Sequence, residues 1–363
     1  MKIRNPASAV LLSGLILIAG GICAPASSFV PRNATYNGLF YETNNSWQQS
    51  SGILTITTTA KGKYTAKLQL GTARYSLAGP FNPDGAIPPR TILRRNLNPL
   101  TLQFQVDPDD PDLITGSVSD GSWSAELYAD RAVFNSRTNT TPDAGQYTMV
   151  LLGDSTSSDT PGGESYGTIT VDKIGRLQFS GYLADGTKLV QSATVSKGGQ
   201  WPFYAPLYGG NGSIYGWLLF NGSADSDLSG NATWIRPRNL SAWYYPGGFA
   251  TIATATGSRY TRPPAATKVL NLSSAAVEFN GADLGRNFTN HITLNTKNQV
   301  KNLDANALSL TFTLSNGSFS GRVKHPVTSD WVPFHGVVLQ KFGVAAGYFP
   351  GWAQTGEIWL EGQ

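Results

Sequence analysis

A short strand-and-turn pattern recurs along this chain and constrains its fold more than any other feature. In the clearest copy, Phe179, Gly181 and Leu183 occupy alternate positions, and Asp185-Gly186 follows them. Alternation places the three residues on one face of a β-strand, and an Asp-Gly pair supplies the positive φ angles of a tight hairpin turn. The pattern therefore predicts an antiparallel hairpin.

Related strands with the order apolar-x-small-x-apolar occur elsewhere at matched spacings. They start at Tyr64 and Ile114, which are 50 residues apart (64 to 114), and at Phe179 and Leu228, which are 49 apart (179 to 228). A third copy starts at Phe319. Two coincidences of motif and spacing predict an internal repeat of three β units.

Composition and the central glycine of the motif indicate the kind of sheet. Only 14% of the 363 residues are charged, and Gly, Thr, Ser, Asn and aromatic residues are abundant, which favours strands and turns over helices. Glycine within a strand suits a bend in a curled sheet, or a place where an aromatic ring from the next strand covers the missing side chain. We therefore predict an all-β fold of tandem antiparallel meander units, as barrels or half-barrels with few helices.

The chain begins with the features of an export signal. Lys2 and Arg4 precede an apolar run that is too short for a comfortable membrane span, and Ala24-Pro25-Ala26 offers a cleavage site. The predicted organisation is a signal peptide over 1–26, β unit 1 over 33–138, β unit 2 over 139–239, a Pro- and Gly-rich loop or linker over 240–267, and β unit 3 over 268–363. We expect an exported protein, located outside the cell, on its surface or in a periplasm, with no stable membrane span after signal removal.

The single cysteine, Cys23, lies inside the predicted signal. A lipoprotein cysteine would lie there, but Ile22 stands where lipid attachment usually needs a small residue, so lipidation is disfavoured. Cleavage after Ala26 removes two of the 27 basic residues and no acid, which leaves 25 minus 23, or +2. The basic residues form small separate groups rather than a stripe, and we expect no nucleic-acid partner.

Motifs that carry catalysis are weak. The run Gly163-Glu164-Ser165-Tyr166-Gly167 fits the formula of a hydrolase nucleophile elbow, but it follows a Gly-rich turn and precedes a strand, so we interpret it as a loop entering a strand. His291, His325 and His335 show no metal-ligand spacing, although the last two could approach across a hairpin. A glycosidase needs two facing carboxylates, and the sequence identifies no such pair. We assign no catalytic residue and favour a protein that is not an enzyme.

One acidic cluster is a candidate cation site. It consists of Asp107, Asp109, Asp110 and Asp112, separated by two prolines. Calcium favours several carboxylates on a short loop, but the spacing differs from that of a helix-loop-helix calcium site. Calcium and a simple solvated turn are therefore both compatible with the sequence, and no other cofactor is expected.

The best candidates for ligand contact are aromatic: Trp201, Tyr208, Trp243, Tyr244 and Tyr245. Exposed aromatic faces stack on the apolar faces of sugar rings, whereas buried ones fill a core. The last three lie in the predicted loop and are the better surface candidates. Trp217 and Trp234 lie in strand patterns and are expected in the core.

Several segments carry a resemblance to a known group of proteins. They are Tyr36-Asn37-Gly38-Leu39-Phe40, Leu183-Ala184-Asp185-Gly186-Thr187-Lys188, Gly199-Gln200-Trp201-Pro202, Pro206-Leu207-Tyr208-Gly209-Gly210, Gly216-Trp217-Leu218 and Gly336-Val337-Val338-Leu339-Gln340-Lys341. This arrangement resembles a poorly characterised β-rich repeat region of exported proteins of environmental bacteria, often found after immunoglobulin-like repeats. The resemblance implies a secreted or surface-attached β module and assigns no catalytic residue.

The leading hypothesis is a secreted or surface-associated, non-catalytic binding or adhesion protein that binds polysaccharide or other cell-surface components. The alternatives are a purely structural surface module, an outer-membrane β-barrel, which alternating strands and many glycines also suit, and a carboxylate-based glycosidase.

Overall fold

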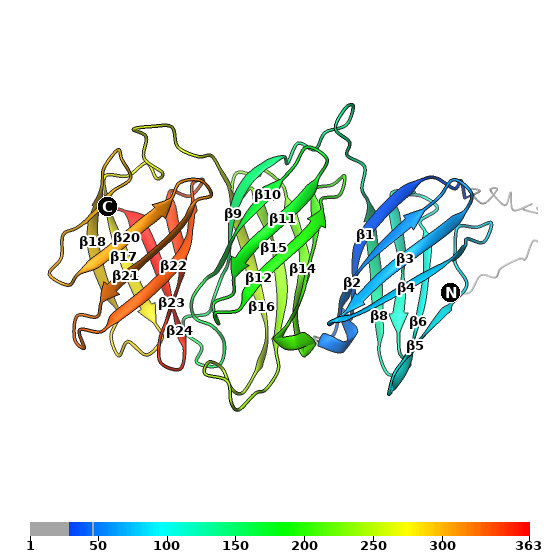
Figure 1. Cartoon of the computed structure of the whole chain (residues 1–363), viewed down its shortest axis with the longest axis horizontal. Coiled ribbons are helices and arrows are strands. Elements are labelled where there is room, and N and C mark those ends of the chain that lie inside the picture. Colours follow the sequence, from blue (N-terminus) through cyan, green and yellow to red (C-terminus); the bar gives the residue numbers. More distant parts are fainter. Residues whose placement is uncertain (1–28, 46) are drawn as a thin grey trace, which may run out of the picture.

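The computed structural model describes residues 29–45 and 47–363 and shows three antiparallel β-sheets in tandem (Figure 1). The expectations for the signal over 1–26 and for Cys23 concern residues outside these ranges. Across the described ranges the regular structure comprises 24 strands and two short 3-10 turns. None of the helices found there is long and apolar enough to cross a membrane.

Each sheet has eight strands. The first contains β1 (Ala34–Tyr41), β2 (Gly52–Thr58), β3 (Lys63–Leu70), β4 (Ala73–Pro80), β5 (Arg90–Arg94), β6 (Leu97–Val106), β7 (Leu113–Ser119) and β8 (Ser124–Arg131). The second contains β9 (Gly145–Leu151), β10 (Ser165–Val171), β11 (Arg176–Tyr182), β12 (Lys188–Thr194), β13 (Gln200–Leu207), β14 (Gly212–Phe220), β15 (Leu228–Arg236) and β16 (Phe249–Tyr260). The third contains β17 (Ser274–Gly281), β18 (Phe288–Leu294), β19 (Val300–Asn302), β20 (Leu308–Thr313), β21 (Ser318–Lys324), β22 (Trp331–Leu339), β23 (Val344–Pro350) and β24 (Thr355–Gly362).

All three sheets share one topology, in which neighbours in the chain pair and the first strand also pairs with the last. β1 pairs with β8, β9 with β16, and β17 with β24. The ladder is interrupted only between two middle strands of each sheet, so each sheet curls into a nearly closed barrel. The predicted all-β fold of tandem antiparallel barrels is confirmed.

Alternation along the strands places apolar side chains inside each barrel. In β11, Leu177, Phe179 and Gly181 are buried while their neighbours are exposed, as the motif predicts. A Cβ atom on Gly167 would lie 2.3 Å from the Phe179 ring, and one on Gly336 would lie 2.5 Å from the Phe319 ring. Aromatic rings therefore cover strand glycines, which is one of the two explanations that the sequence offered.

Two of the three predicted copies of the motif are equivalent. Tyr64 lies in β3 and Phe179 in β11, each the third strand of its sheet, and β7 and β15 are both seventh. Phe319 lies in β21, the fifth strand, so its assignment as the third equivalent copy is wrong. The pattern marks an inward face with a small residue at its centre, and more than one position in a barrel meets that requirement.

The expectation of a loop or linker over 240–267 is also corrected. This range contains β16, which closes the second barrel by pairing with β15 and β9. Its inward positions include Ala253 and Ala255, and threonines alternate with them. Alanine and threonine differ little in hydrophobicity, so their alternation gives a weak strand signal. The prolines and glycines on either side, which do form loops, gave the stronger signal in the sequence.

The three barrels pack side by side in chain order (Figure 1). Between the first and second barrels, Leu39, Tyr204 and Tyr215 are buried, and the Tyr204 hydroxyl accepts a hydrogen bond from the Gly71 N–H at 2.9 Å. Between the second and third, an apolar cluster forms around Val150, Val337, Leu339 and Ala346. The interface between the last two barrels brings loops from both to one edge.

Candidate ligand-binding surface between the second and third barrels

Loops from two barrels meet at one end of the boundary between the second and third barrels. The Tyr244 hydroxyl donates to the Gly351 carbonyl at 3.1 Å, and the Gln354 side-chain amide donates to the Ser158 carbonyl at 3.4 Å. Asp283 Oδ2 accepts the Ala353 N–H at 2.6 Å. We call these segments, residues 152–164, 237–248, 282–287, 325–330 and 351–354, the loop cluster.

A buried ion pair holds the aromatic loop of this cluster in place. Asp185 lies in the hairpin turn after β11, and its fully buried carboxylate pairs with the Arg236 guanidinium at the end of β15. The same guanidinium donates to the Tyr244 carbonyl at 2.8 Å. The turn of the recurring motif is thereby connected, through Arg236, to Tyr244 in the loop over 237–248.

Tyr208 belongs to this buried network. Its hydroxyl donates to Asp185 at 2.6 Å and accepts the Trp234 indole N–H at 3.0 Å, while the Arg236 guanidinium lies 4.9 Å from its ring centre. Burial, followed by the negative charge of Asp185, raises the pKa of the Tyr208 hydroxyl. The prediction of Tyr208 as a ligand contact is corrected, because its polar and aromatic surfaces are occupied within the protein.

The other predicted aromatic residues divide between core and surface. Trp201 is 0% exposed inside the second barrel, where its indole donates to the Gln191 side chain, and Tyr245 is buried with its hydroxyl against Thr355. Their prediction as ligand contacts is wrong, because inward strand positions and the barrel interface enclose them. Trp243 is 68% exposed and Tyr244 is half-buried. These two remain candidates.

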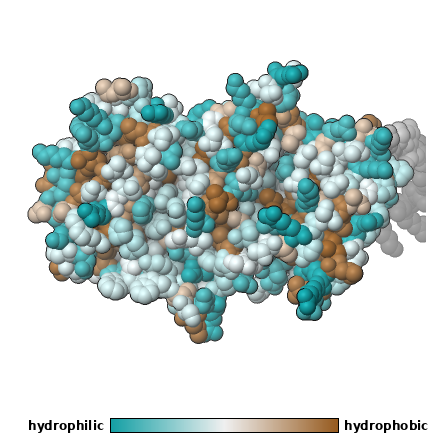
Figure 2. Space-filling view, in the orientation of Figure 1, coloured by the Kyte–Doolittle hydropathy of each residue, from teal (hydrophilic) through white to brown (hydrophobic). Residues whose placement is uncertain are grey.

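The projecting loop that carries them is apolar at its tip. Figure 2 shows hydrophobic atoms at the end of the projection below the second barrel, and Leu240, which belongs to the loop over 237–248, is exposed. Exposed apolar groups that gather on a loop are typical of a surface that contacts a ligand or partner.

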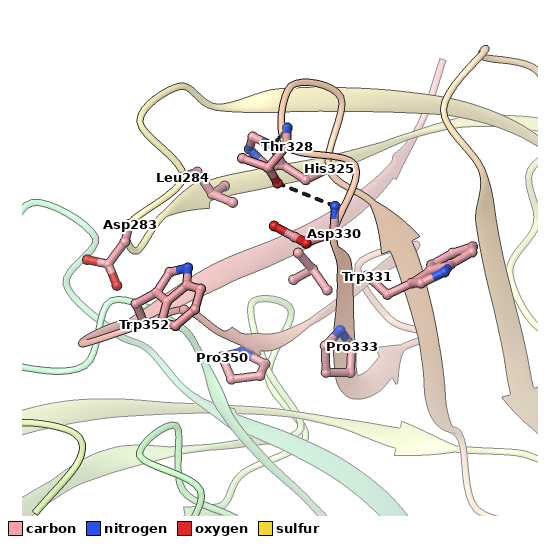
Figure 3. A pocket seen from close by; sticks show the side chains of 11 residues that line it. Asp283, Leu284, His325, Thr328, Asp330, Trp331, Pro333, Pro350 and Trp352 are labelled. Carbon is pink, nitrogen blue, oxygen red and sulfur yellow. Dashed lines mark hydrogen bonds between the residues drawn. The ribbon is translucent and has the colours of Figure 1, made fainter.

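A pocket of about 240 Å³ lies in the loop cluster at the end of the third barrel (Figure 3). Trp352, which is 76% exposed, borders one side with Pro350, and Trp331, which is 46% exposed, lies on the opposite rim with its indole extending away. Neither tryptophan is among the ligand-contact residues predicted from the sequence. The signal that was available for Trp352 is its position beside Pro350-Gly351, which marks a turn.

The pocket also presents polar groups. Figure 3 shows the Asp330 carboxylate extending toward the side on which Asp283 and Trp352 lie. His325 lines the pocket and is only 7% exposed. Its Nδ1 accepts the backbone N–H groups of Val327 and Thr328 at 3.3 and 3.1 Å, so its proton resides on Nε2.

The other two histidines lie apart from this pocket. His335 is opposite Ser320 and Tyr348 in the sheet, and burial lowers the pKa of its imidazole. His291 lies 3.2 Å from an oxygen of Asp304. The three histidines thus have different neighbours within the third barrel.

The carboxylates of the acidic turn are engaged by groups of the protein itself. Asp107 accepts backbone N–H groups of its own turn, and the Asp112 carboxylate lies 2.6 Å from the Arg131 side chain. Arg32 and Lys197 lie 3.6 and 3.5 Å from the same carboxylate. Among the described residues, no three His, Cys, Asp or Glu side chains are grouped so that they could hold a metal ion.

The elbow-like run forms a loop that enters a strand. Ser165 is buried at the first position of β10, and its hydroxyl accepts the Ala184 N–H at 2.9 Å. The preceding Glu164 is buried against the third barrel, where its N–H donates to the Gly347 carbonyl at 3.2 Å. The arrangement is structural, because the serine is enclosed rather than presented to a substrate.

Comparisons with known proteins give distant structural similarity. No protein-family model matches the chain, and the search of curated proteins found no relative. A transferrin binding protein B mutant from Haemophilus parasuis is 9% identical, with a TM-score of 0.24 over 93% of this chain and 77% of that one. Transferrin binding protein B from serogroup B Neisseria meningitidis is also 9% identical, with a TM-score of 0.21 over the same shares. A protein with unknown function from Nostoc punctiforme is 12% identical, with a TM-score of 0.18 over 63% of this chain and 94% of that one. TM-scores this low carry no argument about function.

Proposed function

We propose that this protein is a secreted or surface-associated, non-catalytic binding protein, and that its loop cluster binds polysaccharide. The observation that carries the proposal is the highly exposed Trp352 at the edge of a pocket that also contains carboxylate and imidazole groups. The predicted export signal and the resemblance to exported β-rich repeats support a location outside the cytoplasm.

The chemistry of the loop cluster suits a sugar polymer. An exposed indole offers a flat apolar face for the C–H face of a sugar ring, and carboxylates accept hydrogen bonds from hydroxyl groups. Trp352 and Trp243 lie in neighbouring loops, which are joined through the contact between Tyr244 and Gly351. Two such platforms suit an extended ligand better than a single small molecule.

Binding is favoured over glycoside hydrolysis. A glycosidase needs a carboxyl that surrounding apolar groups keep protonated, opposite a second carboxylate. Asp283 and Asp330 are both exposed to water, and Asp283 is engaged with the backbone of a neighbouring loop. This pair suits the acceptance of hydrogen bonds better than general acid catalysis.

The placement of side chains also argues against an outer-membrane barrel. Such a barrel carries apolar residues outside and polar residues inside. In β3 the reverse holds, because Tyr64 and Leu68 face inward whereas Lys63 and Lys67 are exposed.

The proposal is tested by retention of the mature protein on a panel of insoluble glycans. We expect retention on at least one of them, reduced up to about tenfold in affinity by Trp352→Ala and reduced by Trp243→Ala, because aromatic stacking contributes about 0.5 to 1.5 kcal/mol per contact. Trp47→Ala is the matched control, since Trp47 is also exposed but lies in the first barrel. Absence of retention on every glycan, or equal loss in all three variants, would contradict the proposal.

A further inference from the structure

We infer that the pocket beside Trp352 binds a positively charged amino sugar, so that the polymer recognised contains hexosamine units with free amino groups. This inference rests on the proposed function and names the ligand class of the same site.

Two carboxylates supply the negative charge. Asp283 Oδ2 accepts the Ala353 N–H, which leaves its second oxygen for a ligand. The Asp330 carboxylate has no hydrogen-bond or ion-pair partner within the described ranges, and it extends into the pocket (Figure 3). An unpaired carboxylate in a pocket that Trp352 also lines is suited to a donor that arrives with the ligand.

The lining contains no compensating cation. Neither lysine nor arginine is among the residues that line the pocket in the described chain. His325 Nδ1 accepts two backbone N–H groups, so this nitrogen is occupied within the protein. Arg322 stacks over the Trp331 ring, 4.5 Å from its centre, and does not line the pocket. The lining within the described ranges therefore contains two carboxylates and neither a lysine nor an arginine.

The remaining features suit a sugar rather than a bare cation. A pocket of about 240 Å³ accommodates a single ring, and the Trp352 indole offers both a stacking face and the negative ring face that attracts an ammonium group. His325 Nε2 has no hydrogen-bond partner among the described residues, although the side chain is more than nine-tenths buried. Its N–H can donate to a ring hydroxyl while the carboxylates bind the amino group and its neighbours.

The test compares two oligosaccharides that differ only at nitrogen. Titration calorimetry would measure the binding of a β-1,4-linked glucosamine pentasaccharide and of its fully N-acetylated counterpart, at a pH where the free amine is protonated. We expect the free amine to bind about tenfold or more tightly, with an affinity that falls as salt is raised. Asp330→Asn should remove most of this preference, and Asp225→Asn, at an exposed loop position of the second barrel, should retain it.

The possible outcomes distinguish failure of the amino-sugar inference from failure of polysaccharide binding itself. Equal binding of both oligosaccharides, or an unchanged preference in Asp330→Asn, overturns the amino-sugar inference but leaves polysaccharide binding in place. Preferential binding of a lysine-rich peptide over the glucosamine oligomer overturns the inference in favour of a protein partner. Absence of binding to every glycan overturns both proposals. Circular dichroism of each variant checks that the barrels remain folded.

Discussion

Replacement of Glu164 by glutamine should remove a large pH dependence of stability. Glu164 lies immediately before β10, 5% exposed, against the third barrel. Its Oε2 is buried without a hydrogen-bond partner in the described chain. Burial, with the like charge of Glu357 as a second cause, raises the pKa of the Glu164 carboxyl from 4.5 to about 9.

The direction of the pH dependence follows from the protonation of Glu164 in the folded and unfolded states. Between pH 4.5 and about 9 the folded protein retains a proton on Glu164 that the unfolded chain releases. The free energy of unfolding therefore carries no penalty from Glu164 below pH 4.5. As pH rises toward 9, it falls by about 1.4 kcal/mol per pH unit. At neutral pH the cost is therefore about 3 kcal/mol relative to mildly acidic solution.

Glutamine keeps the shape of the side chain and cannot ionise. Urea unfolding of wild type and Glu164→Gln over a pH series would give the difference in unfolding free energy, in which shared titrations cancel. We expect the variant to gain about 1.4 kcal/mol relative to wild type for each pH unit between mildly acidic and mildly alkaline solution. Glu126→Gln, at an exposed position, is the matched control. A difference that does not vary with pH would refute the reasoning.

Two further substitutions test the packing that supports the site. Asp185→Asn leaves the Arg236 guanidinium buried without its counter-ion, so we expect a loss of about 3 to 5 kcal/mol in urea unfolding and faster proteolysis of the loop over 237–248; unchanged cleavage would contradict the anchoring role. Gly336→Ala places a methyl group 2.2 Å from the Ala346 carbonyl oxygen and 2.5 Å from the Phe319 ring, so the melting temperature should fall by several degrees. Gly247→Ala, with open space around it, should be close to neutral. Equal melting temperatures for the two variants would contradict the close packing at Gly336.

Local patterns were sufficient to predict the strands but not their closure into barrels. Phe179 and Leu68 alternate with exposed neighbours, so their inward orientation follows from a few adjacent residues. β16 was missed because alanine and threonine differ little in hydrophobicity. Trp201 was predicted as a ligand contact because it lies in a segment rich in aromatic residues. The local sequence does not reveal that β13 directs its side chain into the barrel.

The pocket could not be predicted because its residues come from distant segments. Asp283 follows β17, Asp330 precedes β22, and Trp352 lies between β23 and β24. They meet because β17 pairs with β24, which closes the third barrel. Nothing local to any of the three residues encodes that pairing. The loop carrying Trp243 was predictable from its prolines and glycines, whereas its contact with the third barrel was not.

The pairing of the first and last strands in each barrel bears on how the number of barrels can change in evolution. Tyr36 lies opposite Arg131, Gln146 opposite Tyr260, and Ala275 opposite Gly362. The chain thus enters and leaves each barrel at adjacent points, so a gene segment encoding one barrel can be duplicated, deleted or exchanged without stretching its neighbours. After such a change, the side chains at the contacts between neighbouring barrels must become complementary to the new neighbour.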